Sequence, residues 1–318
     1  MTTSDPHKPQ DGRTAIPDHS CGRREFLKAA GAVSVAMVAG RLTGAESSPA
    51  EKKMPQIQIG KRSISRLVCG NNTFGAGSHL SVFVNEEMRR YFTPEQIIKT
   101  LGRCEEVGIN TWQASAGSLD LYRRYIDGGG KMQFLAIETD QPGVVEKLAK
   151  GGCIGIAHHG ESTDGLFKGK QLDKVNELLK RVRDAGLLAG VSTHMPDVVD
   201  AIESKGWDLD YYMTCVYERH RSEDDLRKLL GHVPIPVGEV YLKSDPPRVF
   251  KVMRQTKRPC LAFKILAAGR LSERREWVEQ AFKDTFASIK ANDGVIVGIY
   301  DRYGDQAAEN AAFVRRFG

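Results

Sequence analysis

The sequence lacks any paired-cysteine motif. Its six cysteines are scattered along 318 residues, and none forms a C-x-x-C pair, which argues against a zinc ribbon or a redox dithiol. Cys21 lies in a polar N-terminal stretch, and the other five lie in apolar helical or strand patterns. We therefore expect five buried free thiols in the folded part rather than a disulfide framework.

Long runs of one chemical character are also missing. Lysine and arginine outnumber aspartate and glutamate to give a net charge of +6, but they form no extended cluster, so we expect no nucleic-acid partner. The apolar stretch 29–40 is shorter than the roughly 20 residues that span a bilayer, so we expect no stable membrane span. No G-x-G-x-x-G follows an early strand pattern, which argues against a doubly wound dinucleotide-binding fold.

The N-terminal segment has the features of an export signal. Arg23 and Arg24 precede Phe26 and Leu27, and a mildly apolar run rich in Ala, Gly and Val follows. This order resembles a twin-arginine signal. The resemblance implies that residues 1–50 are an export signal and linker, that the twin-arginine export machinery is a partner, and that the protein is periplasmic or otherwise extracytoplasmic. An uncleaved helix tethered to a membrane is the alternative.

Beyond residue 50, short β-branched runs alternate with amphipathic helical patterns, which predicts βα units and a parallel sheet. Thr93 and Pro94, for example, mark the start of a helix whose apolar residues recur at helical spacing until Gly108. We predict a single-domain α/β protein, a (β/α)8 TIM barrel over residues 51–318 that is preceded by a small hairpin. The expected barrel strands cover residues 65–70, 110–115, 133–139, 153–158, 187–193, 209–217, 260–266 and 295–300.

Two segments exceed a minimal barrel. Residues 75–90 follow the first expected strand, and residues 233–247 follow the sixth and contain a run suited to an extra strand. Loops that follow barrel strands lie at the C-terminal face, where active sites of this fold are found. We expect both segments to shape a substrate pocket.

Several stretches together resemble the aldo-keto reductases, a family of (β/α)8 oxidoreductases. They occur in the family's order over roughly residues 54–318 and are Ile64–Gly75, Glu105–Thr111, Ala189–Thr193, Ala262–Leu271 and Glu309-Asn310. The resemblance implies an exported oxidoreductase that acts on a small carbonyl or sugar-like substrate with a nicotinamide cofactor, NAD or NADP.

The catalytic positions depart from the family pattern. The family works with Asp, Tyr, Lys and His, of which the tyrosine donates a proton to the carbonyl. In this sequence Gln113 takes the place of the aspartate and Glu138 that of the lysine, and His158 matches the histidine. Tyr122 is the tyrosine nearest to the expected position of the proton donor. The resemblance therefore points to a degenerate tetrad of these four residues, with His158 or Tyr122 as the proton donor. We expect Glu138 and His158 to share one pocket at the barrel mouth.

The cofactor positions are closer to the family pattern. The resemblance implies that Phe263 stacks on nicotinamide and that Lys264 reaches a pyrophosphate. Arg302 offers a phosphate partner after the last strand, but the neighbouring Asp301 favours a free ribose hydroxyl and hence NAD. The full set of predicted cofactor residues is Ser192, Thr193, Phe263, Lys264, Arg302, Glu309 and Asn310.

Polar residues at the ends of four neighbouring strands support a second interpretation. Glu138, His158, His194 and Glu218 supply two imidazoles and two carboxylates, a ligand set suited to a divalent metal. A metal there would polarise a carbonyl or activate water. The protein would then be a metal-dependent sugar isomerase, epimerase or lyase. A third hypothesis is a non-catalytic barrel that binds a ligand.

Overall fold

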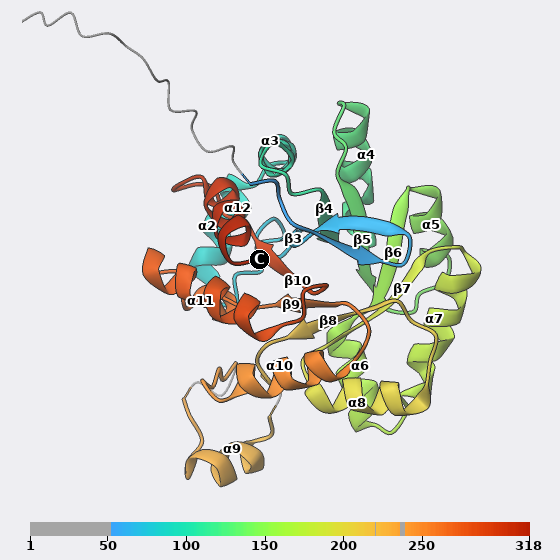
Figure 1. Ribbon diagram of the computed structural model, residues 1–318, viewed down its shortest axis with the longest axis vertical. Helices are drawn as coiled ribbons and strands as arrows, with labels where there is room; N and C mark the ends of the chain where they lie inside the picture. Colours follow the sequence, from blue (N-terminus) through green and yellow to red (C-terminus); the bar gives the residue numbers. More distant parts are fainter. Residues whose placement is uncertain (1–51, 220, 236–238) are drawn as a thin grey trace, which may run out of the picture. The chain divides into compact units, whose positions relative to one another are not determined.

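The computed structural model describes residues 52–219, 221–235 and 239–318. The predicted export signal and linker, residues 1–50, lie outside these ranges. Eight parallel strands close into a barrel in the order β10-β3-β4-β5-β6-β7-β8-β9 (Figure 1), which confirms the predicted (β/α)8 architecture. The strands are β3 (Leu67–Gly70), β4 (Thr111–Ala114), β5 (Gln133–Glu138), β6 (Cys153–His158), β7 (Leu188–Thr193), β8 (Tyr211–Cys215), β9 (Cys260–Phe263) and β10 (Gly294–Gly298).

A β-hairpin closes the N-terminal end of the barrel. Strands β1 (Gln56–Ile59) and β2 (Arg62–Ser65) pair antiparallel, with Ile57 opposite Ile64. Ile57, Ile59 and Ile64 are fully or almost fully buried and pack in one cluster with side chains of the barrel interior. The hairpin therefore seals the end opposite the strand C-termini.

Helices connect the strands and surround the barrel (Figure 1). The predicted helix start is confirmed, because Thr93 accepts a hydrogen bond from the backbone N–H of Gln96 and Pro94 stands in the first turn. The helices are α2 (Val82–Tyr91), α3 (Pro94–Glu106), α4 (Leu119–Asp127), α5 (Val144–Lys150), α6 (Gly160–Lys168), α7 (Asp173–Asp184), α8 (Pro196–Lys205), α9 (Glu223–Leu230), α10 (Asp245–Gln255), α11 (Arg275–Ser288) and α12 (Gln306–Phe317), with the short turns η1 (Ala116–Ser118) and η2 (Ala267–Gly269).

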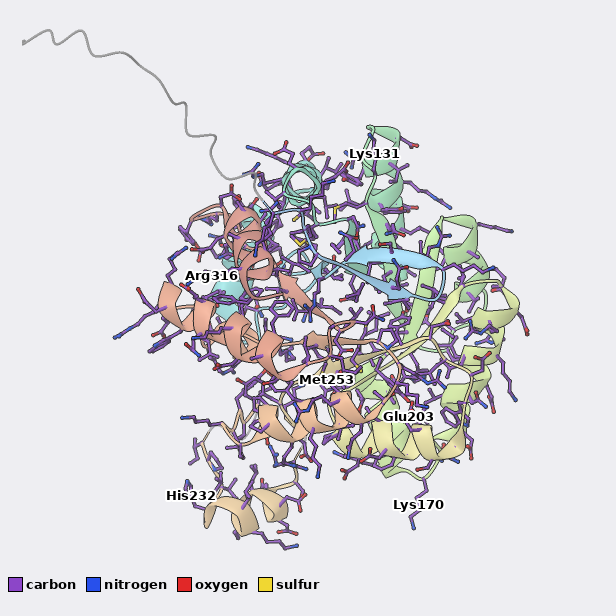
Figure 2. All side chains as sticks on the ribbon, in the orientation of Figure 1. Lys131, Lys170, Glu203, His232, Met253 and Arg316 are labelled. Atoms are coloured by element: carbon purple, nitrogen blue, oxygen red, sulfur yellow. The ribbon has the colours of Figure 1, made fainter. Side chains whose placement is uncertain are left out.

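The helix layer is amphipathic, with apolar side chains toward the barrel. Figure 2 shows Met253 on the inner side of its helix and Lys131 and Lys170 at the periphery, in keeping with the full burial of Met253. Polar bonds also tie the layers together, since the Tyr212 hydroxyl on β8 donates to Glu203 on α8 at 2.7 Å. None of the helices in the described ranges is long and apolar enough to cross a membrane.

Alternation along the strands creates two cores. Leu135, Met213 and Leu261 belong to the cluster inside the barrel, together with the hairpin isoleucines. Their neighbours Phe134 and Ala262 belong to the larger cluster between barrel and helices. Because side chains alternate with a period of two, a difference of one residue at a strand end moves a side chain from one core to the other. The five cysteines of the described residues are free and buried, as predicted.

The two predicted insertions differ in structure. Residues 75–90 form a loop followed by most of α2, so this segment places a helix beside the C-terminal face. The second insertion, residues 233–247, contains no strand in its described residues and leads instead into α10. The expected extra strand is therefore not found there.

Candidate active site

A pocket of about 650 Å³ opens at the C-terminal mouth of the barrel. Gln113, His159 and Ser192 line it at the ends of β4, β6 and β7. Glu309 and Asn310 line it from α12, at the side of the barrel where β9 and β10 meet. The pocket thus has two parts. One is the polar end of the barrel interior, which Gln113, His159 and Ser192 line, and the other is a groove between the strand ends and α12. Its volume falls in the range of small-molecule and cofactor sites.

Strand alternation keeps Glu138 and His158 out of this pocket. They are direct neighbours in the sheet, as predicted, but Ile137 and His159 line the mouth in their place. The carboxylate of Glu138 accepts a hydrogen bond from the backbone N–H of Ala116. The expectation that both side chains project into the mouth is therefore wrong. On each strand, the side chain that lines the mouth is one residue away from the predicted one.

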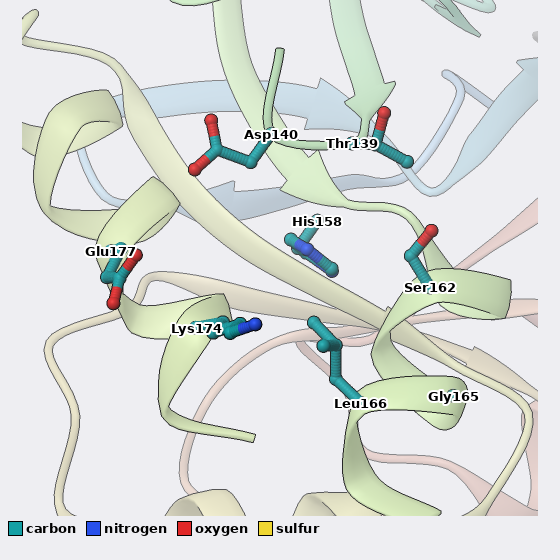
Figure 3. Close-up of a pocket in the computed structure, with 8 residues that line it drawn as sticks. All are labelled: Thr139, Asp140, His158, Ser162, Gly165, Leu166, Lys174 and Glu177. Carbon is teal, nitrogen blue, oxygen red and sulfur yellow. The ribbon is translucent and has the colours of Figure 1, made fainter. Parts of the chain in front are cut away.

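His158 instead lines a second pocket, of about 450 Å³, between the barrel wall and the helices (Figure 3). Figure 3 shows its imidazole at the centre, with Thr139 and Asp140 from the loop after β5 and Lys174 from α7 around it. Only 2% of His158 is exposed, and its Nδ1 lies 2.7 Å from the Thr163 hydroxyl. Burial, assisted by the neighbouring His159, lowers the pKa of His158 to about 4, so the ring is neutral at physiological pH.

Tyr122 also lies away from the mouth. It is buried on α4, its ring stacks on Phe134 with centroids 4.8 Å apart, and its hydroxyl donates to the backbone carbonyl of Met132 at 3.1 Å. Burial raises the pKa of the Tyr122 hydroxyl. Of the four residues predicted to be catalytic, Gln113 lines the pocket, and Glu138, His158 and Tyr122 pack outside it.

The predicted metal ligands are not brought together. Glu218 forms ion pairs with Arg221 at 3.2 Å and with Arg248 at 2.8 Å, and His194 bonds to Asp164. Within the described ranges, no group of three or more His, Cys, Asp or Glu side chains is placed to hold a metal ion. The set of Glu138, His158, His194 and Glu218 is therefore corrected, because its members face different sides of the barrel wall.

Most of the predicted cofactor residues gather in one place. The residues of this set that line the pocket are Ser192, Phe263, Lys264, Glu309 and Asn310. Thr193 faces the helices and donates to Asp164 at 2.5 Å. Arg302 lies outside the pocket, where it pairs with Glu87 at 3.2 Å. Glu309 is held by an ion pair with Arg275, which also lines the pocket.

Lys264 has an unusual backbone and an unusual side chain. Its φ of 59° lies in the left-handed region, which non-glycine residues seldom adopt and which is enriched at functional sites. Its Nζ is buried and has no hydrogen-bond partner among the described residues. Burial lowers the pKa of Lys264, and the carboxylate of Glu239 opposes that effect. A buried ammonium without an acceptor is costly unless a ligand supplies one.

A buried carboxylate that the sequence analysis missed lies beside the mouth. Asp164 on α6 accepts a hydrogen bond from His194 Nδ1 at 2.8 Å and another from the His194 backbone N–H at 3.0 Å. The His194 ring lines the pocket and meets Phe263 edge-on, with centroids 5.3 Å apart. Asp164 stands inside an ordinary amphipathic helix pattern, so nothing in its sequence context marked it.

Polar contacts tie the loops at the rim of the pocket. His79, from the loop after β3, lies 2.8 Å from Glu239 in the second insertion, and Arg219 pairs with the same carboxylate. Burial raises the pKa of Glu239, but hydrogen bonds from His79 and Tyr241 outweigh it and hold the pKa below its ordinary value. The first insertion therefore lines the pocket, as predicted, whereas no described residue of the second does. The second insertion contacts the rim through Glu239.

The chain is similar in fold to solved barrel enzymes of different activities. The glycerol dehydrogenase AKR11B4 from Gluconobacter oxydans is 13% identical with a TM-score of 0.49, and the match covers 83% of this chain and 90% of that one. A truncated 3-deoxy-D-arabino-heptulosonate 7-phosphate synthase from Thermotoga maritima is 12% identical with a TM-score of 0.47, over 83% and 91%. No family model and no curated sequence matches the chain. Likeness at this level carries no argument about this chain, so function has to be argued from the site.

Proposed function

We propose that the barrel is an oxidoreductase of aldo-keto reductase type, which reduces a small carbonyl compound with a nicotinamide dinucleotide. One observation carries the proposal. A single pocket joins five of the predicted cofactor residues to the polar end of the barrel interior. Such a pocket accommodates an elongated ligand in the groove and a small molecule in the barrel mouth.

The residues present suit a dinucleotide. Phe263 offers an aromatic face beside the barrel interior for a nicotinamide ring, and Glu309 and Asn310 offer polar atoms for adenine at the other end of the pocket. Lys264 has a buried Nζ that lacks an acceptor in the described ranges, and a phosphate oxygen would supply one. When bound, the cofactor supplies the hydride.

The choice between NAD and NADP depends on the cations near the ribose. Asp301, which the sequence suggested as a ribose partner, already accepts from Tyr91 at 3.2 Å and from Thr100 at 2.8 Å. Arg302 is paired outside the pocket. Arg275 is the cation that lines the pocket beside Glu309. Asp301 also does not line the pocket, so the site lends no support to the sequence argument for NAD, and both cofactors belong in the test.

Calorimetric titration of the full chain with NADH and with NADPH tests the proposal. We expect binding of at least one of them, and at least about tenfold weaker binding by Lys264→Met, because a buried charge-assisted hydrogen bond contributes roughly 1.5–3 kcal/mol. Lys251→Met is the matched control, since Lys251 is exposed on α10 and does not line the pocket. Absence of heat with either dinucleotide at millimolar concentration would refute the cofactor assignment.

We also propose that the protein is exported in folded form by the twin-arginine route. The support is the sequence order Arg23, Arg24, Phe26 and Leu27. These residues lie outside the described ranges, so the proposal rests on sequence alone. A folded passenger suits a cofactor enzyme, because the dinucleotide is acquired in the cytoplasm.

A further inference from the structure

We propose that His194 and Asp164 form the acid–base pair of this site, in which Asp164 positions the imidazole and His194 exchanges a proton with the substrate's carbonyl oxygen. This inference rests on the proposed function, because the reaction that it serves is carbonyl reduction. His194 follows β7 and Asp164 lies in α6. Neither occupies one of the four positions that the family resemblance had marked as catalytic.

Asp164 is fixed by several donors. Only 3% of its side chain is exposed. The Thr193 hydroxyl donates to it at 2.5 Å, and the backbone N–H of His194 donates at 3.0 Å. An ionised carboxylate accepts hydrogen bonds and donates none. The bond at 2.8 Å between Asp164 and His194 Nδ1 therefore places a proton on Nδ1.

That bond determines which nitrogen of His194 does the chemistry. With Nδ1 protonated, the neutral ring has its basic lone pair on Nε2. Proton exchange with a bound molecule then takes place at Nε2. A carboxylate in this position also stabilises the imidazolium that forms when the ring takes up a second proton.

The ring is closely packed. Phe263 meets it edge-on at an interplanar angle of 83°. A Cβ added to Gly160 would lie 3.1 Å from His194 Cε1 and 2.9 Å from the Ser192 hydroxyl, so glycine at position 160 leaves space for the imidazole. Gly160, Ser192, His194 and Phe263 all line the pocket. A ring restrained in this way is preorganised for proton transfer.

Carbonyl reduction needs one hydride and one proton. A bound reduced nicotinamide would supply the hydride to the carbonyl carbon as the π bond of the C=O group breaks, and the oxygen would take the Nε2 proton of the His194 imidazolium. The alcohol leaves, and the neutral imidazole, still protonated on Nδ1, regains a proton from solvent. Phe263 and His194 are neighbours, which places the proton donor beside the proposed nicotinamide position.

Turnover is the first test, with glyceraldehyde as the carbonyl probe and the dinucleotide that binds. We expect His194→Gln to lower kcat by about 100-fold or more. Asp164→Asn should lower kcat by at least about tenfold with little change in KM, because it disturbs the tautomer rather than binding. His158→Gln is the matched control, because it removes a buried imidazole that lines a different pocket. A His194→Gln enzyme that binds the dinucleotide and keeps more than about a tenth of wild-type kcat would overturn the proposal.

A second measurement needs no turnover. Carbethoxylation by diethyl pyrocarbonate, followed by peptide mass spectrometry, reports the nucleophilicity of each imidazole. We expect His194 to react several-fold more slowly in Asp164→Asn than in wild type, with the exposed His232 unchanged as the internal reference. Equal His194 rates in the two proteins would overturn the pairing. If no dinucleotide binds, the proposed function fails, and the carbethoxylation rates still decide whether Asp164 activates His194.

Discussion

His158 shows how the face of a strand on which a histidine lies changes the pKa of its imidazole. His159, its neighbour, lines the barrel mouth, whereas His158 points between the barrel and the helices. In that place the ring is shielded from water, and burial lowers its pKa to about 4. The folded protein therefore resists protonation of a group that the unfolded chain protonates readily.

This difference predicts a loss of stability in mild acid. The unfolded chain takes up a proton near pH 6.5, whereas the folded state takes it up near pH 4, so the free energy of unfolding falls as the pH drops through this window. The shift corresponds to about 3 kcal/mol by pH 4. Urea unfolding followed by tryptophan fluorescence between pH 7 and pH 4 measures it.

His158→Gln is the control for this prediction, because glutamine does not titrate. The variant should show a flatter pH dependence than wild type, by about the same 3 kcal/mol over the window. Parallel pH profiles for the two proteins would show that His158 is not the group responsible.

At the scale of elements, the barrel interior depends on small residues facing large ones. Gly190 on β7 is the sheet neighbour of Tyr211 on β8, and a Cβ at position 190 would overlap the Tyr211 ring. Tyr211 is fully buried, so its ring has little space to move. Close packing of this kind makes the interior intolerant of added volume.

Gly190→Ala should therefore destabilise the protein by about 1–3 kcal/mol, the usual cost of overpacking a core. Gly102→Ala is the opposite case. Gly102 lies inside α3 with no atom within 4 Å of an added Cβ, so alanine should stabilise the helix by about 0.5–1 kcal/mol. Urea midpoints of the two variants, measured side by side, give the comparison. Equal effects of the two substitutions would contradict the interior packing.

The strands and helices could be predicted from the sequence more accurately than the residues of the site. Alternating patterns predicted the eight strands, and capping at Thr93 predicted the start of α3. The predicted strands 133–139 and 153–158 match β5 and β6, but a strand's position does not by itself say which of its two faces lines the barrel interior. Ile137 and His159 therefore line the mouth where Glu138 and His158 were expected. Asp164 was missed because only the fold brings a helical carboxylate next to His194.

At the scale of the whole molecule, the proposed export signal and the proposed enzyme occupy separate parts of one sequence. Replacing Arg23 and Arg24 together by lysine preserves the charge but removes the twin-arginine feature. We expect the precursor of this variant to accumulate in the cytoplasm, still folded and still able to bind its ligands. Cell fractionation and immunoblotting measure the distribution. Unchanged export of the double variant would contradict the assigned route.

The hairpin of β1 and β2 has a consequence for kinetics. Because Ile57, Ile59 and Ile64 pack against the barrel interior and close its N-terminal end, a ligand in the mouth cannot leave through the barrel interior. Under the proposed function, the cofactor and the carbonyl compound share one approach to the site at the strand C-termini, and we expect their release to follow a fixed order.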